Sequence, residues 1–530
     1  MFRIAAVFAA LAIVVGIPFA LKPKQNLLAA ADDTLVIISP HNGAIRYEFT
    51  RAFAEFYQKQ TGRTVRIDWR LVGGTSEIAK YLKSEYYAAF QRAWVAEGRA
   101  WNAEVEAAFD NPQVKPSESS GAGTPAQAAR RAFLKSDAGI GIDLFFGGGS
   151  YDFIQQANAG RLVDSGLLRA KPEWFTDAAI PPSVSGETYY DRAGRWIGAC
   201  ISSFGICYNT DSLRRLGFTS IPAAWSDLAD PRFVQQVALA DPTKSGSAAK
   251  AYEMIIQQQM QERVAKLGET PEALAAGWAA GLRIIQRVSA NARYFTDAAS
   301  KVPLDVSAGD AAIGMCIDFY GRFQSEAVKL ADGSSRLQYF TPAGGSSPSV
   351  DPIGQLRGAP NAKIARFFME YALSLEGQKL WNFRVGAPGG PVRYALRRLP
   401  VLKELYAPQY AEYRSDPEVN PYREAGTFYY HSEWTGHLLR VLSFIIRNLS
   451  LDSHDELTAA WQALIAADFP PEATAKFSDL SAVDYALAQG RLRDVTRSAD
   501  RIQEVQLAQE LGDHFRNQYR EAARLAKEGR

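Results

Sequence analysis

Short apolar runs and helical stripes alternate along the chain from residue 34 onward. Residues 34–38 are mostly β-branched, and residues 64–71 alternate apolar with polar side chains, which is typical of a half-buried strand. Between these runs lies an apolar stripe with the spacing of one helix face, formed by Ile45, Phe49, Phe53 and Phe56. The order strand, helix, strand, helix predicts an α/β fold with parallel strands joined by crossover helices.

The same alternation continues up to about residue 400. Further strands are predicted at residues 142–146, 196–208, 237–240 and 311–317, and helices at 248–260 and 363–383. Residues 111–128 are rich in Pro, Ser, Gly and Ala, which indicates an exposed loop inside an insertion. A chain of 530 residues is too long for one hydrophobic core, so two or three domains are expected.

The strand signal fades after residue 401. Residues 434–449 carry a helical apolar stripe, and residues 501–530 are charged and helix-prone. We therefore expect residues 401–530 to be a helical extension. Its apolar stripe would pack on the main body or on a partner protein. If it packs on a partner protein, the chain could be a tethered scaffold or receptor subunit.

The bulk charge and the cysteines argue against two classes of protein. The 59 basic and 57 acidic residues give a formal net charge of +2, without a long basic run, so nucleic acid is not an expected partner. The three cysteines, Cys200, Cys207 and Cys316, include no C-x-x-C pair. They suit neither a disulfide scaffold nor a zinc site and are expected to be small buried side chains. No cofactor is expected.

The N-terminus has the pattern of a bacterial secretory signal. A positive start at residues 1–3 precedes an uncharged, mostly apolar run at 4–21, and residues 29–31 match the small-residue cleavage pattern. Residues 1–31 are therefore predicted to be a signal peptide, which places the protein in the periplasm. Because the apolar run is near the lower limit for crossing a bilayer, a signal anchor that tethers the protein to the membrane is the alternative.

Turns rich in glycine and hydroxyl side chains follow four of the predicted strands. In open α/β sheets, ligands bind at the carboxyl ends of strands, where helix N-termini direct N–H groups and a positive dipole into the same space. Each turn alone could be an ordinary helix cap, but four at successive strand ends predict an anion site. The candidate residues in these turns are Ser39, His41, Asn42, Gly74, Thr75, Ser76, Gly149, Ser150, Thr243, Lys244, Ser245, Gly246 and Ser247. His41 could instead stabilise the turn without touching a ligand, and Lys244 could instead be a solvated surface lysine.

The order of several short motifs along the chain resembles the iron(III)-type branch of extracellular solute-binding family 1, the periplasmic binding proteins of ABC transporters. They cover roughly residues 34–400. The matching stretches are Ser39-Pro40, Gly73-Gly74-Thr75-Ser76-Glu77, Trp196-Ile197-Gly198, Gly205-Ile206-Cys207-Tyr208-Asn209, Trp225-Ser226-Asp227-Leu228-Ala229-Asp230-Pro231, Asp241-Pro242-Thr243-Lys244-Ser245-Gly246-Ser247, Gly358-Ala359-Pro360-Asn361 and Glu376-Gly377-Gln378-Lys379-Leu380-Trp381.

The resemblance implies a type II periplasmic-binding-protein fold, in which two lobes joined by two hinge strands close on a solute and then dock on the membrane subunits of an importer. It places hinges near residues 204–208 and 338–341. The expected division is lobe I at 32–203 and 343–400 and lobe II at 204–342. The resemblance also adds Ser203, Asp318 and Tyr320 to the candidate site.

The resemblance leaves two ligand classes open. Ferric-ion members carry an adjacent tyrosine pair near the position of Tyr320, whereas this chain has Phe319-Tyr320. Ferric iron wants several hard anionic oxygen ligands, and only Asp318 and Tyr320 can be named. Members that take phosphorylated sugars or phosphonates use Ser, Thr and helix N-termini instead. A small anionic, phosphorylated or phosphonate solute is therefore preferred over ferric iron.

The sequence offers one enzymatic alternative. Ser247 and Lys250 fit the S-x-x-K pattern of serine acyl-transferases, and residues 289–291 fit a loose S-x-N, but no K-T-G follows. The resemblance implies a binding protein and not an enzyme.

Overall fold

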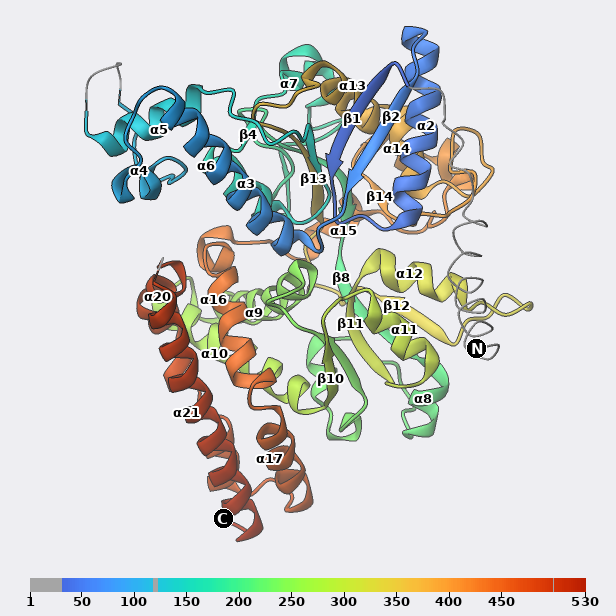
Figure 1. Cartoon of the computed structure of the whole chain (residues 1–530). Helices are drawn as coiled ribbons and strands as arrows, with labels where there is room; N and C mark the ends of the chain where they lie inside the picture. Colours follow the sequence, from blue (N-terminus) through green and yellow to red (C-terminus); the bar gives the residue numbers. More distant parts are fainter. Residues whose placement is uncertain (1–30, 118–122, 499) are drawn as a thin grey trace, which may run out of the picture.

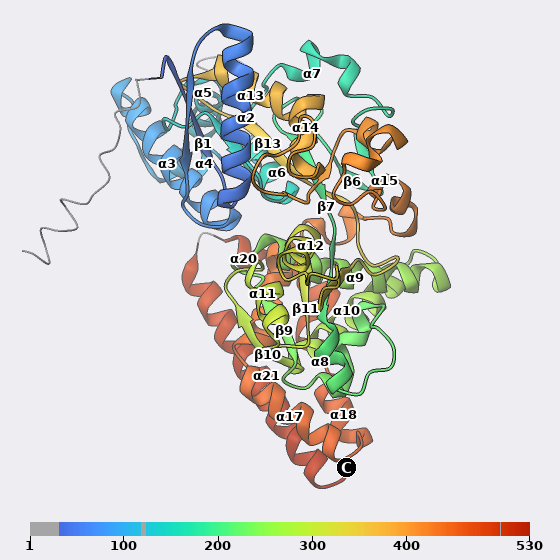
Figure 2. The same ribbon diagram turned by 90° about the vertical axis from the view of Figure 1, so that its right-hand side faces the viewer.

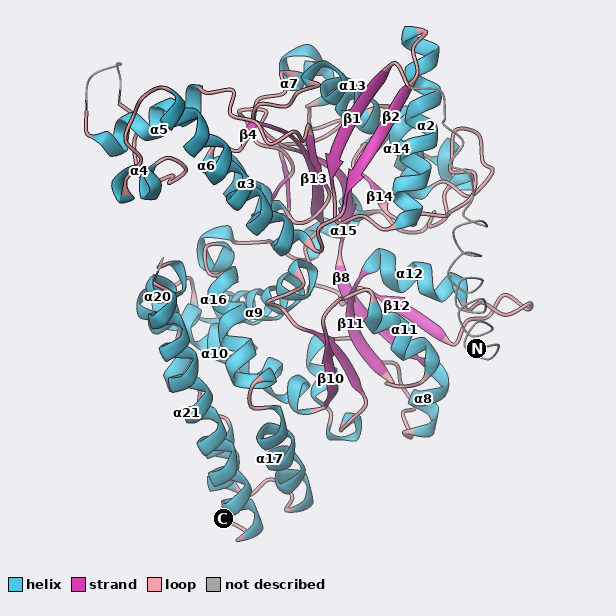
Figure 3. Cartoon of the chain, in the orientation of Figure 1, coloured by secondary structure: helices cyan, strands magenta, loops and turns pink. Residues whose placement is uncertain are grey.

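The computed structural model describes residues 31–117, 123–498 and 500–530 and contains two mixed β-sheets with helices around each (Figures 1 and 3). We call the unit around the seven-stranded sheet the first lobe and the unit around the five-stranded sheet the second lobe. The predicted signal segment lies outside the described residues, apart from residue 31. Within the described ranges, no helix is both long and apolar enough to span a bilayer.

The seven-stranded sheet has the order β14-β7-β13-β3-β1-β2, with β4 paired to β13. β1, β2 and β3 are parallel neighbours, whereas β13 runs antiparallel to β3, β4 and β7, and β14 antiparallel to β7. Its strands are β1 (Asp33–Ile38), β2 (Val65–Arg70), β3 (Leu144–Phe146), β4 (Leu162–Val163), β7 (Ile197–Ser202), β13 (Ser349–Leu356) and β14 (Leu399–Pro400). The hairpin β5 (Ser183–Val184) and β6 (Glu187–Thr188) lies beside this sheet.

The five-stranded sheet has the order β10-β9-β11-β8-β12. β9, β10 and β11 are parallel, and β8 is antiparallel to both β11 and β12. Its strands are β8 (Phe204–Asn209), β9 (Val237–Ala240), β10 (Ala292–Thr296), β11 (Ile313–Ile317) and β12 (Leu337–Phe340).

Helices cover both sheets. Around the first sheet these are α2 (Gly43–Thr61), α3 (Thr75–Ala96), α4 (Ala103–Ala108), α5 (Pro125–Lys135), α6 (Ser150–Ala159), α7 (Leu167–Ala170), α13 (Ala362–Leu373) and α14 (Leu375–Asn382). Around the second are α8 (Thr210–Arg215), α9 (Gly246–Leu267), α10 (Pro271–Ala290), α11 (Lys301–Ala308) and α12 (Asp318–Ala327). The C-terminal segment adds α15 (Pro421–Glu424), α16 (Leu439–Ile446), α17 (His454–Ala466), α18 (Pro471–Phe477), α19 (Tyr485–Leu487), α20 (Arg493–Arg497) and α21 (Arg501–Lys527).

Helix α2 shows how the sequence pattern becomes structure. Asn42 accepts a hydrogen bond from the backbone N–H of Ile45 and so caps the N-terminus, and Gly62 ends the helix with a φ of 72°. Ile45, Phe49 and Phe53 of the predicted stripe are buried against the sheet. The spacing therefore predicted the buried face of α2, with Phe56 of the stripe half-buried.

Over the described residues, the chain passes between the lobes at three places. β7 leads into β8 at Ser203, and residues 341–348 lead from β12 into β13. The third passage follows α15, where residues 425–430 lead from the first lobe to the second. The hinge positions and domain limits expected from the sequence remain predictions.

The C-terminal segment packs on both lobes (Figure 2). Val401 and Leu402 belong to the core of the first lobe, and Val419 and Tyr422 pack against it. From Phe428 onward, the buried side chains belong to the core of the second lobe, where the Trp461 indole N–H donates to the Asn291 side chain at 2.8 Å. The extension thus packs its apolar stripe on the main body.

The predicted α/β class with two lobes and a helical C-terminal segment is confirmed. Two predicted elements are divided. Residues 196–208 form two strands in different sheets because the chain changes lobe at Ser203, and the helix at 363–383 is interrupted by Ser374, which caps α14. The three cysteines are free and buried, as expected.

Candidate functional site

The turns after β1, β2 and β3 pack against one another. Because these strands are parallel neighbours, their carboxyl ends meet at one edge of the sheet. A Cβ built on Gly147 would lie 2.4 Å from the His41 ring, and one on Gly148 would lie 2.5 Å from the Thr75 side chain. Both glycines also have positive φ, 92° and 121°. Only glycine permits this close packing.

A turn of the second lobe faces this edge. A Cβ on Gly74 would lie 3.5 Å from the Lys244 carbonyl oxygen, and one on Gly246 would lie 3.8 Å from Oδ2 of Asp152, in the first turn of α6. Ser245 caps α9 by accepting from the N–H of Ala248, and its hydroxyl lies 3.2 Å from that of Ser247. We call the turns at residues 73–76, 147–150 and 243–247 the turn cluster. It joins strand ends from both lobes.

Carboxylates already lie at the helix starts of the turn cluster. Glu77 folds back over the start of α3, where its Oε2 would lie 3.1 Å from a Cβ on Gly74. Burial and the nearby Glu77 carboxylate raise the pKa of Asp152 to about 7. Asp241 accepts from both the N–H and the hydroxyl of Thr243. The charge of Asp152 therefore changes near neutral pH, next to the start of α9.

A second group of polar side chains lies where the lobes touch beside β13. His41 is 4% exposed, packs edge-on against Phe146, and lies 3.9 Å from Asp351. Burial lowers the pKa of His41 to about 4, so the ring is neutral at physiological pH. Asp351 forms a buried ion pair with Arg398. The Arg398 guanidinium stacks on the Phe319 ring, which belongs to the second lobe, at 3.6 Å.

The start of α12 contributes Asp318 to this contact. The Asp318 N–H donates to the carbonyl of Ser203 at 2.9 Å, its Oδ1 accepts from the N–H of Phe319 at 2.8 Å, and Arg322 lies 3.2 Å away. Burial raises the pKa of Asp318 to about 6. Burial also raises the pKa of Tyr320 above its usual value.

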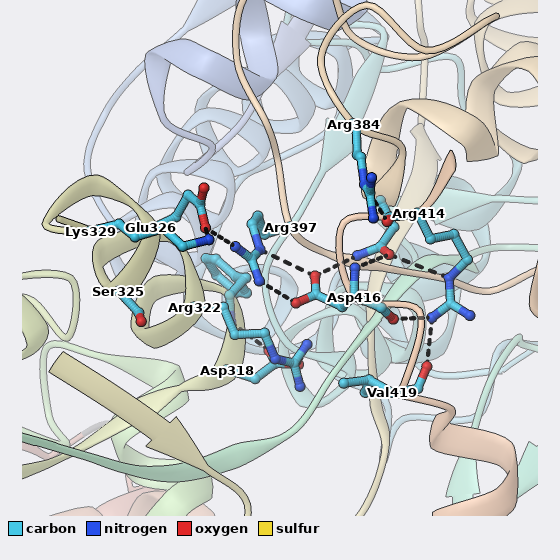
Figure 4. A network of polar contacts seen from close by, with 12 residues as sticks. Asp318, Arg322, Ser325, Glu326, Lys329, Arg384, Arg397, Arg414, Asp416 and Val419 are labelled. Carbon is cyan, nitrogen blue, oxygen red and sulfur yellow. Dashed lines mark hydrogen bonds and ion pairs between the residues drawn. The ribbon is translucent and has the colours of Figure 1, made fainter. Parts of the chain in front are cut away.

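An ion network continues outward from this point (Figure 4). Arg397 of the first lobe pairs with Asp416 and reaches Glu326 of α12, in the second lobe, at 3.1 Å. The guanidinium of Arg414 donates to the carbonyls of Asp416 and Val419, which holds the segment after residue 414 in place. The two lobes are therefore in polar contact at the outer edge as well.

Residues 141–398 match the family model of bacterial extracellular solute-binding proteins. The solute-binding character expected from the sequence is confirmed over these residues, and the iron(III)-type branch stays a prediction.

Two curated proteins are similar to parts of the chain. It is 27% identical over 244 residues to an uncharacterized protein of Haemophilus influenzae, covering 45% of this chain and 60% of that protein. It is 24% identical over 184 residues to the phosphoglycerate transport regulatory protein PgtC of Salmonella typhimurium, covering 35% and 40%. The chain thus spans about half the length of these curated relatives.

Solved structures of periplasmic binding proteins are also similar. Iron-bound HitA from Pseudomonas aeruginosa aligns with a TM-score of 0.46 and 16% identity over 78% of this chain and 99% of that one. AfuA from Actinobacillus pleuropneumoniae, with fructose-6-phosphate bound, aligns with a TM-score of 0.43 and 18% identity over 66% and 82%.

Most of the predicted solute-binding residues fall into two groups. Gly74, Thr75, Ser76, Gly149, Ser150 and residues 243–247 lie in the turn cluster, whereas His41, Ser203, Asp318 and Tyr320 lie at the Arg398 contact. Ser39 is buried and accepts from the N–H of His41. Asn42 is a helix cap, and the Lys244 ammonium pairs with Asp297 at 2.6 Å.

Four charged residues in these groups were not among the sequence candidates. Glu77 and Asp152 stand in first turns of helices that follow glycine turns, a position that could have drawn attention to them. Asp351 and Arg398 do not follow a glycine turn at a helix start. They meet only because strands β7, β13 and β14 pair in the folded sheet, so no local sequence pattern predicts their contact. Within the described ranges, no group of three or more His, Cys, Asp and Glu residues is arranged to hold a metal ion.

The serine acyl-transferase alternative needs an unprotonated Lys250. Its ammonium instead lies 3.1 Å from Glu187 and 2.9 Å from Glu253. Burial alone would lower the pKa of Lys250, but these two carboxylates raise it above its usual value. A lysine that stays protonated cannot accept a proton from Ser247.

Proposed function

We propose that this chain is the exported, extracytoplasmic solute-binding component of an ABC importer, which captures a small anionic solute between its two lobes. The family match at residues 141–398 supports the solute-binding role. The observation that carries the proposal is the meeting of strand-end turns from both lobes, at Gly74 with Lys244 and at Gly246 with Asp152.

The anionic end of the solute is assigned to the start of α9. This helix is 22 residues long, its first turn has the backbone N–H groups and positive dipole of any helix N-terminus, and Thr243, Ser245 and Ser247 add hydroxyl groups. A relative named for phosphoglycerate transport supports a phosphorylated solute. Closure of the lobes would remove the solute from water and strengthen each polar contact.

The carboxyl group of Asp152, next to this turn, affects how well an anion binds. An anion at the start of α9 would lie close to Asp152, so it binds best when Asp152 is protonated. Ferric iron is the weaker candidate, because the raised pKa of Tyr320 opposes the phenolate that a ferric ligand requires.

A thermal-shift screen tests the proposal. The full chain is mixed with sugar phosphates, phosphonates, inorganic phosphate, polyamines or ferric salts, and its melting temperature is measured. A phosphorylated or phosphonate compound should raise the melting temperature in proportion to the logarithm of its concentration above Kd. A shift with ferric salts alone, or with polyamines alone, would overturn the anionic assignment.

A further inference from the structure

A buried cluster of charged side chains joins the lobes on the side of the molecule where the chain makes its third passage. Its members come from four separate segments. Lys250 and Glu253 lie on α9 of the second lobe, and Glu187 lies on β6 of the first. Tyr430 comes from the C-terminal segment just after the passage. Ser347 comes from the connection between β12 and β13.

The contacts of the cluster cross the lobe boundary. The Lys250 ammonium lies between the two carboxylates, 3.1 Å from Glu187 and 2.9 Å from Glu253. The Ser347 hydroxyl donates to Glu187 at 2.6 Å. Glu187 is 2% exposed and Glu253 is fully buried, so water does not screen the pair formed by Lys250 and Glu187.

The third passage closes over this cluster. The Tyr430 hydroxyl donates to Glu253 at 2.9 Å, and the Tyr430 ring lies 3.4 Å from the Lys250 ammonium. The Tyr430 N–H donates to the Ser185 carbonyl of the β5–β6 hairpin at 2.7 Å. One residue of the C-terminal segment thus binds both lobes. In Figure 2, β6 and α15 lie next to each other on the side of the first lobe that faces α9.

We infer that Glu187, Lys250, Glu253 and Tyr430 form a latch, in which the C-terminal segment and a buried interlobe ion pair hold the lobes in the arrangement of this structure, with the turn cluster in contact, even without solute. Opening the lobes would separate Lys250 from Glu187 and leave charged groups buried without their partners. The latch also anchors α9, whose first turn is the proposed anion site.

The test measures the distance between the lobes of the full chain without any solute. Spin labels are placed at Lys59→Cys on α2 and Arg214→Cys on α8, two exposed positions in different lobes, and the native cysteines are all buried. Pulsed electron–electron double resonance then gives the distribution of interlobe distances. The interlobe distance of this structure should dominate in the parent chain.

Three variants remove parts of the latch. Lys250→Met leaves two buried carboxylates facing each other and should give the largest gain of longer distances, roughly 10-fold or more in population. Glu187→Gln should give a smaller gain, because the Lys250 and Glu253 pair remains. Tyr430→Phe removes only one hydroxyl and is expected to fold normally, with a gain that is smaller still.

Lys171→Met is the matched control. Lys171 pairs with Glu370 at 2.9 Å entirely within the first lobe, so its removal should leave the distance distribution unchanged. Unchanged distributions in both Glu187→Gln and Tyr430→Phe would overturn the latch. An equal change in Lys171→Met would overturn it too. Since no solute is present, neither outcome depends on the proposed function.

Discussion

The guanidinium of Arg398 lies 3.6 Å above the ring of Phe319, and the two residues belong to different lobes. Arg398 also pairs with Asp351, which in turn approaches the buried, neutral ring of His41. The first candidate turn of the sequence is therefore connected to the second lobe through a chain of three side chains. Replacement of Arg398 should affect both the stability and the lobe contact.

Arg398→Met should lower the free energy of unfolding by about 3–5 kcal/mol, because it leaves the Asp351 carboxylate buried without its partner. Urea denaturation followed by tryptophan fluorescence measures this loss. Arg92→Met, on an exposed position of α3, is the control and should change the free energy by less than about 0.5 kcal/mol. Equal effects of the two variants would contradict the importance of the buried pair.

Gly147→Ala should destabilise the protein far more than Gly217→Ala. Both glycines have positive φ, 92° and 77°, so both substitutions strain the backbone. Only at Gly147 would the new Cβ meet a side chain, the His41 ring, whereas the space around Gly217 is open. Overpacking should add about 1–3 kcal/mol to the loss at Gly147. Thermal unfolding of the two variants checks the difference.

Ser247→Ala should weaken binding of a phosphorylated solute by about 1.5–3 kcal/mol, or roughly 10- to 100-fold in Kd, because a hydrogen bond to a charged group is lost. Isothermal titration calorimetry with the compound that gives the largest shift in the screen measures this change. Ser84→Ala, at an exposed position of α3, should leave Kd unchanged. An unchanged Kd in Ser247→Ala would remove this turn from the site.

The affinity for an anion should fall as pH rises from about 6 to 8. The pKa of Asp152 is raised to about 7, so its carboxylate is mostly neutral at the lower pH and mostly charged at the higher, where it repels the bound anion. Inorganic sulfate is the suitable probe because its own charge does not change in this range. Asp152→Asn should bind sulfate with nearly the same Kd at both pH values. A pH dependence that survives this substitution would contradict the role of Asp152.

Trp461→Ala should lower the free energy of unfolding by about 3–5 kcal/mol, because Trp461 is 3% exposed in the core of the second lobe and donates a hydrogen bond to Asn291. Tyr429→Ala, at a side chain that is 56% exposed, is the control. If Trp461→Ala left the stability unchanged and abolished binding of a partner protein, the C-terminal segment would be an independent partner module after all.

Much of the local structure follows directly from the residues. The stripe from Ile45 to Phe56 predicted α2, and the short apolar run before Asp241 predicted β9. These segments are defined by periodicity and capping, which act over a few neighbouring residues. The same reasoning predicted the turns that make up the turn cluster, because glycine and hydroxyl residues at strand ends have local causes; their role in binding a solute stays a prediction.

The sequence by itself therefore determined the α/β class, the strand-end turns and the helical character of the C-terminal segment. The tertiary structure alone decided that Arg398 meets Asp351, that Lys250 meets Glu187, and that the extension binds both lobes. The two ion pairs join residues that are 47 and 63 positions apart in the sequence, and no local pattern predicts such pairs. Their free energy arises only when the strands are paired and water is excluded from the groups between them.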